Sequence, residues 1–156
     1  MSCDIFKVLA ITIFNDIFEN DTIIAYCNWA EGRDAALDIT VINPLQQATV
    51  AQAAETPGHS LDFAFNRKMR GTAEECERQG VAFIPLAFES LGGWHKTAEK
   101  QVKKLAQAVA RQSGVDESEC CSQATSRLSL LLMKGNSAIL INRIPSATDP
   151  VIDGIE

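Results

Sequence analysis

The sequence predicts one mixed α/β (α+β) domain, with an N-terminal β-hairpin and a mostly helical C-terminal half. Two runs rich in β-branched residues, 22–29 and 35–42, flank the short polar segment AEGRD, which is typical of an antiparallel hairpin. Beyond residue 95 the apolar residues recur with helical periodicity. The 156 residues, 46% of them hydrophobic, suffice for a single core.

A helical region is expected after the hairpin. Strong helix formers occupy residues 45–55, after Pro44 has closed the second strand. The sequence TPGH at 56–59 interrupts them. Ser60 is the predicted N-cap of a second helix, which extends towards Gln79.

One more strand and two more helices complete the expected domain. The strand lies at 81–88, and Pro85 within it indicates an edge position or a bulge. A helix at about 96–112 follows, because its apolar residues recur at i, i+4, i+7 and i+11 and form one stripe. A last helix is expected around 123–133, where Gly135 should end it.

The charges are unevenly distributed. A net charge of −6 argues against a general nucleic-acid or membrane binder. Residues 66–111, however, hold nine Lys and Arg against five Asp and Glu. Five of these basic residues share one face of the predicted helix 96–112, and this basic face is either a solvated helix surface or a contact for nucleic-acid phosphates: Lys96, Lys100, Lys103, Lys104 and Arg111.

The cysteines and the N-terminus bear on the cellular compartment. The five cysteines are odd in number and include no C-x-x-C pair, so we expect reduced thiols in an intracellular protein, nuclear or cytoplasmic. The apolar run from Val8 to Phe14, interrupted only by Thr12, is too short to span a membrane. Residues 1–19 are therefore expected to pack as a strand or a short helix, without a membrane partner.

Asp38 is an unusual residue for the predicted strand 35–42. Aspartate is depleted in strand interiors, and a buried carboxylate is costly unless something compensates its charge. Side-chain alternation places Asp38 and Thr40 on the same face. Two interpretations are open: a carboxylate that holds a divalent cation, or one tied to Thr40 and nearby backbone donors.

Two further residues have chemical potential. Lys68 lies on the helix that follows the Asp38 strand, where a lysine could orient a water or stabilise charge on a phosphate. Glu89 comes just after the third strand, where a helix-entry role is favoured over a ligand role. His59 and His95 lie in predicted turns, and neither has a partner that the sequence identifies.

Three segments together resemble a known family. The D-x-T-V strand ending in Pro44, the helix with Lys68 in FNRK, and the strand leading to Gly-Gly-Trp at 92–94 occur in that order between about residues 20 and 146. They resemble the restriction-like endonuclease domain, of the PD-(D/E)XK type, that accompanies the reverse transcriptase of non-LTR retrotransposons. The resemblance implies a restriction-endonuclease-like mixed sheet with flanking helices. Residues 1–19 and a loose tail at 147–156 lie outside it.

This resemblance implies a hydrolase that cuts DNA with the help of Mg²⁺, or of Mn²⁺ as an alternative. Two aspartates would hold the ion, which activates a water for attack on the phosphodiester. By position, Asp38 matches the second of these aspartates and Lys68 the family's helix lysine, while Thr40 stands where other nucleases have lysine. DNA, with RNA as an alternative, is the implied partner, together with a parent reverse transcriptase.

The chain departs from the family at the first aspartate. Counting back from Asn28 and Trp29, that position is occupied by Ile23, and the nearest carboxylate before it is Asp21. Asp21 is thus the candidate second metal ligand beside Asp38, about 6–7 Å further along the strand than the family position. The sequence predicts an endonuclease with impaired activity. The alternative is an inactive remnant that acts as a nucleic-acid-binding or protein-interaction module.

Overall fold

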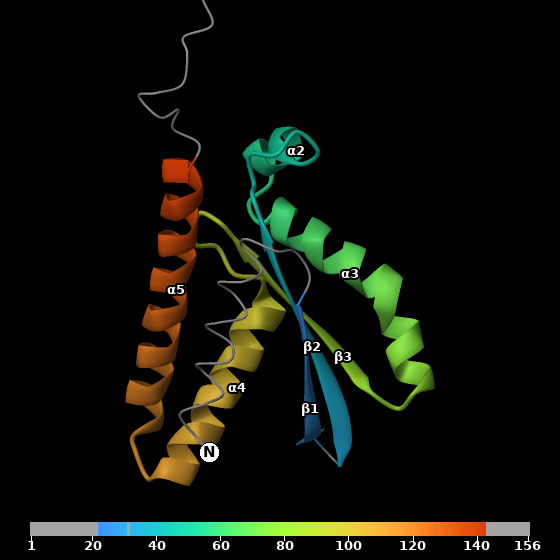
Figure 1. Cartoon of the computed structure of the whole chain (residues 1–156), viewed down its shortest axis with the longest axis vertical. Helices are drawn as coiled ribbons and strands as arrows, with labels where there is room; N and C mark the ends of the chain where they lie inside the picture. Colours follow the sequence, from blue (N-terminus) through green and yellow to red (C-terminus); the bar gives the residue numbers. More distant parts are fainter. Residues whose placement is uncertain (1–21, 31, 143–156) are drawn as a thin grey trace, which may run out of the picture.

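The computed structural model describes residues 22–30 and 32–142 and contains a three-stranded sheet with helices on both faces (Figure 1). The strands are β1 (Thr22–Ala30), β2 (Arg33–Ile42) and β3 (Ala82–Glu89), in that spatial order. β1 is antiparallel to β2, and β2 is parallel to β3. The predicted mixed α/β class is therefore confirmed.

The N-terminal hairpin forms where the sequence predicts it. Gly32, with φ of 75°, lies in the turn between β1 and β2, a backbone conformation that glycine adopts at little steric cost. β3 lies at one edge of the described sheet. An edge strand tolerates Pro85, which has no N–H to donate to another strand on its outer side. The predicted edge position of this strand is confirmed.

Two helices connect β2 to β3. α2 (Val50–Glu55) is shorter than the predicted 45–55, because the residues before Val50 form turns. α3 (His59–Arg78) lies close to the predicted range, but its N-cap is Gly58, with φ of 82° and no side-chain cap. The prediction of Ser60 as the N-cap was wrong. Ser60 lies inside the first turn of α3, where its side chain is buried and free to bond elsewhere.

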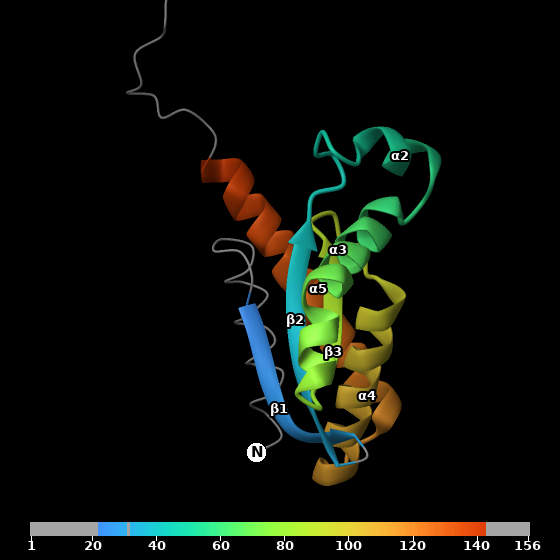
Figure 2. The same cartoon turned by 90° about the vertical axis from the view of Figure 1, so that its right-hand side faces the viewer.

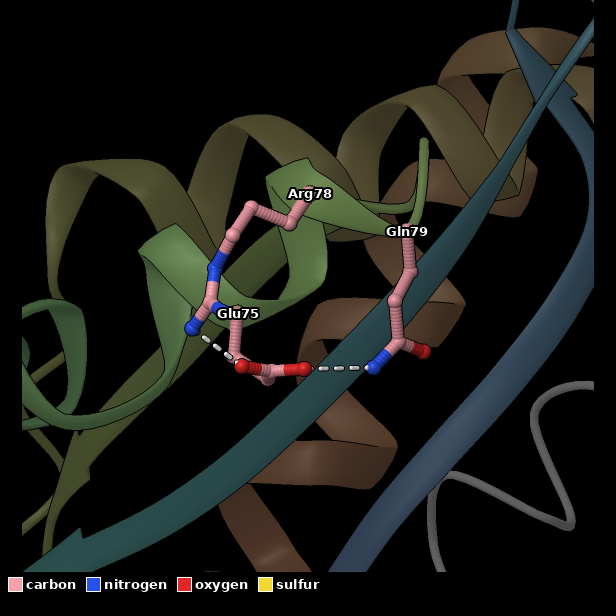
Figure 3. Close-up of polar contacts among 3 residues, drawn as sticks. All are labelled: Glu75, Arg78 and Gln79. Atoms are coloured by element: carbon pink, nitrogen blue, oxygen red, sulfur yellow. Dashed lines mark hydrogen bonds and ion pairs between the residues drawn. The ribbon is translucent and has the colours of Figure 1, made fainter.

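The end of α3 is held by a small polar group at the surface (Figure 3). Arg78 forms an ion pair with Glu75, and Gln79 Nε2 donates a hydrogen bond to Glu75 Oε1 over 2.8 Å. Both partners of the ion pair are more than half exposed. Such pairs contribute little to stability, since water competes for both charges.

Two long helices form the C-terminal half. α4 (Lys96–Ser113) confirms the predicted helix at 96–112. α5 (Glu117–Asn142) extends well beyond the predicted 123–133, and Gly135 lies inside it rather than at its end. Gly135 is buried within the helix, and this tertiary context overrides its low helix propensity.

The two faces of the sheet pack against different helices (Figures 1 and 2). Leu37 and Ile39 of β2 join a core with α4 and α5 that includes Leu128 and Leu132. The opposite face packs against α3 in a smaller cluster formed by Ile42, Leu61, Ala64 and Ala87. Alternate residues of β2 thus belong to different layers, as the period of a strand requires.

Several sequence predictions concern residues that this fold only partly covers. The segments 1–19 and 147–156 lie outside the described residues, and the proposed division into domains stays a prediction. Cys76, Cys120 and Cys121 form no disulfide within the described ranges. None of the described helices is long and apolar enough to cross a membrane.

Candidate functional site

Asp38 lies at the centre of the sheet, on the face that packs against α3. It is only 2% exposed, in register with Pro85 of β3 on one side and Ile23 of β1 on the other. Thr40, two residues along β2, is also buried. The sequence-based expectation that Asp38 and Thr40 share one buried polar face is confirmed.

Lys68 meets Asp38 from the middle of α3. Its Nζ lies 3.2 Å from Asp38 Oδ1, and the two side chains are 11% and 3% exposed. The parallel arrangement of β2 and β3 requires a crossover, and α3 is that crossover, so a residue halfway along it faces the centre of the sheet. The structure therefore brings together two of the residues that the sequence singled out.

Burial makes this ion pair energetically different from a surface pair. Removing both charges from water is costly, and their mutual attraction in a low-dielectric interior offsets that cost only in part. Loss of one partner, however, would leave the other charge buried without the charge that it faces in this pair, which is strongly destabilising. The sequence left open which group compensates the buried charge of Asp38, and in the structure Lys68 supplies at least part of that compensation.

The position opposite Asp38 in the hairpin bears on metal binding. The residue in register with Asp38 is Ile23. Position 23 is also where the sequence resemblance places the first aspartate of the family. Directly opposite residues of an antiparallel pair share one face of the sheet, so an oxygen ligand would be needed at position 23. Asp21, the substitute ligand suggested by the sequence, lies outside the described residues.

The described residues around Asp38 do not fit a divalent cation. Mg²⁺ and Mn²⁺ are held by oxygen ligands, with one or two carboxylates beside several waters for Mg²⁺, and the only carboxylate described at this position, Asp38, is already paired with Lys68. Isoleucine supplies no ligand atom, and nowhere in the described ranges do three His, Cys, Asp or Glu side chains cluster to hold a metal. We therefore derive no metal-dependent step from this arrangement.

The basic face predicted for the helix 96–112 lies on the outside of α4. The helix buries Ala98, Val102 and Leu105, which leaves the opposite side to solvent. All five basic residues are exposed. Arg111 is paired with Glu117 over 2.8 Å, whereas among the described residues no ion pair involves Lys96, Lys100, Lys103 or Lys104. Four exposed cationic groups thus lie along one helix.

Glu89 connects the end of β3 to the start of α3. It accepts a hydrogen bond from the hydroxyl of Ser60, and the backbone turns back on itself directly after it. Gly92 has φ of 101°, and a Cβ on Gly93 would collide with the Glu89 carboxylate. The turn therefore requires glycine at position 92, whereas a side chain at position 93 would require the Glu89 carboxylate to shift. The sequence favoured a role for Glu89 at the beginning of a helix, and Glu89 does contact one. That helix is α3, however, and not α4, which follows Glu89 in the chain.

His95 is a buried structural residue that the sequence did not identify. Its Nδ1 accepts a hydrogen bond from the backbone N–H of Thr97 and so caps α4, while its Nε2 lies 3.2 Å from Asp62 Oδ1. The ring stacks on Phe65 at 4.3 Å between centroids. Burial lowers the pKa of His95 despite the opposing effect of Asp62. The contacts suit a neutral ring protonated on Nε2.

A helix cap at residue 95 could have been anticipated from the sequence. The start of the amphipathic pattern at residue 96 places His95 at the N-cap position. Histidine is not among the preferred capping residues, so propensity gave no indication of it. The contact with Asp62 joins α4 to α3, and such a long-range pair leaves no pattern in a single sequence.

The chain was compared with models of protein families, with curated proteins and with solved structures, and none of them matches it.

Proposed function

We propose that this chain is an endonuclease-like domain that binds nucleic acid without cleaving it. The fold proposed is the restriction-endonuclease-like one of non-LTR retrotransposons, which the order of the three sequence motifs suggests. The observation that carries the proposal is the register of the hairpin. Isoleucine stands opposite Asp38, where the resembling enzymes have their first metal-binding aspartate.

The Asp38–Lys68 pair supports the same proposal. In an active restriction-like endonuclease, the lysine would orient the attacking water or stabilise charge on the phosphate. Here its ammonium group lies 3.2 Å from the aspartate, and both side chains are nearly buried. A carboxylate that is neutralised by a lysine has less negative charge to offer to a cation. We infer that the pair no longer takes part in a reaction.

The basic face of α4 is the proposed contact for nucleic acid. Its four lysines carry no partner among the described acidic groups, and they follow one side of an 18-residue helix. Lysines of this kind neutralise phosphates and release counterions, so binding should weaken steeply with salt. Such contacts read no sequence, and both DNA and RNA are candidate ligands.

The binding experiment measures the affinity for a short DNA duplex, and for RNA, by fluorescence anisotropy over a series of salt concentrations. Replacing Lys100, Lys103 and Lys104 by glutamine should reduce the slope of log K against log salt by about 0.9 for each phosphate that is no longer neutralised. The matched control removes three exposed charges from other helices, with Arg70, Arg78 and Lys134 replaced by glutamine. An equal effect of both triple variants would contradict a binding face on α4.

The cleavage experiment incubates supercoiled plasmid with the protein and either Mg²⁺ or Mn²⁺ at low salt. The proposal expects no nicking above that of Asp38→Asn prepared in the same way. Nicking by the wild type that Asp38→Asn abolishes would favour the second candidate function, a weak endonuclease. That candidate is favoured by the presence, side by side, of both residues that match the enzyme motif, Asp38 and Lys68, whereas the burial and charge pairing of the same two residues favour the non-cleaving proposal.

A further inference from the structure

α5 has apolar side chains on the side that faces away from the core. Its inner side contributes Ala124, Leu128 and Leu132 to the core. At about 100° per residue, Leu130, Met133, Leu140 and Ile141 fall within an arc of about 100° on the opposite side. These four side chains are between 52% and 64% exposed. We call them the outer face of α5.

The outer face is confined to the C-terminal half of α5. The corresponding positions one and two turns earlier are Ser126 and Ser122, which are exposed and polar. In Figures 1 and 2 this half of the helix extends past the N-terminal end of α4. A helix that is apolar on both sides is normally covered on both sides. Clustered exposed apolar residues therefore indicate a binding surface.

We propose that the outer face of α5 is covered by residues 5–18 of the same chain. Ten of these fourteen residues are Ile, Phe, Val, Leu or Ala. Moving apolar surface of this extent out of water is energetically favourable, so a stretch of that composition should pack against another apolar surface. The outer face and residues 5–18 thus present two apolar surfaces that complement each other.

The connection to β1 places this segment within reach. Thr22, the first residue of β1, is in register with Ile39 of β2. Ile39 belongs to the same core as Leu132, which lies in the C-terminal half of α5. The outer face extends for about 17 Å along the helix, from Leu130 to Ile141. Twenty-one residues precede Thr22, and an extended chain covers more than 3 Å per residue.

The charges are complementary as well. Residues 1–21 contain four acidic groups, Asp4, Asp16, Glu19 and Asp21, and a single lysine, Lys7. The outer face is flanked by the exposed cations Arg127 and Lys134. Neither cation has an ion-pair partner among the residues that the structure describes. A second copy of the chain would bring the same cations to the surface, whereas the N-terminal segment brings opposite charges.

The test exploits Lys7, which is the only trypsin site before Arg33. The full chain is digested briefly with trypsin, and cleavage after Lys7 is followed by intact mass. In the wild type this cleavage should be slow, because a packed segment must open before it is cut. The double variant Met133→Gln/Leu140→Gln should be cut roughly tenfold faster or more, and Ser126→Gln, on the same side of α5, should match the wild type.

The oligomeric state is measured on the same samples by light scattering, with helix content checked by circular dichroism. The proposal expects monomers throughout. A wild-type dimer that the double variant dissociates would assign the outer face to a second copy and overturn the proposal. Equal rates of cleavage after Lys7 in all three proteins, whether fast or slow, would overturn it too, because the segment would then lie elsewhere or be uncovered.

Discussion

The two faces of the central strand β2 differ sharply in what they bury. On one face Leu37 and Ile39 pack into an apolar core with residues of β3, α4 and α5. On the other face Asp38 and Thr40 lie under α3, with Lys68 paired to Asp38. One strand thus carries an apolar core and a polar, charged layer only one residue apart.

The two faces of β2 therefore contribute differently: the apolar face to stability, and the charged face to a candidate functional site. The apolar face stabilises the fold in proportion to the area that it removes from water. The charged face costs desolvation energy that a hydrophobic pair of similar volume would avoid. Buried charges that a fold does not need for stability are candidates for an ancestral or present functional site. The predictions that follow separate the two faces by substitution.

The largest effect is expected on the apolar face, from Phe88→Ala. Phe88 is fully buried and contacts Trp94 edge to face, with the ring centroids 5.2 Å apart. Its removal leaves a cavity and should lower the free energy of unfolding by about 3–5 kcal/mol. Urea unfolding measures the change. Leu91→Ala, at an exposed position just after β3, is the control and should change it by about 0.5 kcal/mol or less.

On the charged face, Asp38→Ala should destabilise the protein by about 3 kcal/mol, because Lys68 is left buried without this carboxylate. The informative partner is the double variant Asp38→Leu/Lys68→Met. It should recover most of the loss and even exceed the wild type, since two apolar side chains replace a desolvated ion pair. A double variant as unstable as Asp38→Ala would show that the charges are themselves stabilising.

A smaller effect is expected from His95, which joins the two helical layers. Burial lowers its pKa, so the folded state keeps the ring neutral at a pH where the unfolded chain binds a proton. The resulting stability is present above the ordinary histidine pKa of 6.5 and is lost as the pH falls below it. Asp62 and Lys96 are the charged groups that act on the ring, in opposite directions.

The measurement is urea unfolding at pH 7.5 and pH 5.5. The wild type should lose more stability between these values than His95→Gln, which cannot titrate. His59→Gln replaces the only other histidine and should keep the wild-type dependence. His95→Ala should in addition cost about 1 kcal/mol at pH 7.5 through loss of the helix cap. Equal pH dependence in wild type and His95→Gln would argue against a neutral cap.

The smallest effect is expected from the surface pair at the end of α3. Glu75→Gln removes the ion pair with Arg78 while keeping a side chain of similar shape (Figure 3). Because both groups are more than half exposed, the change in the free energy of unfolding should be about 0.5 kcal/mol or less. Thermal unfolding at low and high salt should give the same small difference. A loss comparable to that of Asp38→Ala would remove the distinction between buried and exposed pairs.

The hairpin, the edge strand β3 and helix α4 could be predicted because their signals are local. Strand alternation placed Asp38 and Thr40 on one face, and a single apolar stripe defined α4. α5 was underestimated because Gly135 was treated as a stop. In the structure Gly135 is buried inside the helix, where tertiary packing outweighs its low intrinsic propensity.

The candidate site was predictable only in part. Asp38 was singled out as a carboxylate inside a predicted strand and Lys68 by its place on the following helix, and the structure places them in contact. The Ser60–Glu89 and His95–Asp62 contacts join residues about thirty positions apart, and no periodicity indicates such pairs. Ser60 was predicted as a helix cap from residue type alone. In the structure α3 begins earlier, at His59, and its N-cap is Gly58, which has a positive φ. What Asp38, Lys68 and the basic face of α4 do stays a prediction.

The central claim is that this site lacks the carboxylate that would stand at position 23, and thermal unfolding with added Mn²⁺ tests it most directly. A metal that binds the folded state raises the melting temperature, and the rise grows with the ratio of metal concentration to Kd. We predict no Mn²⁺-dependent rise for the wild type beyond that of Asp38→Asn, and a clear rise for Ile23→Asp, whose new carboxylate would face Asp38 across the hairpin. A rise in the wild type that Asp38→Asn abolishes would contradict the claim.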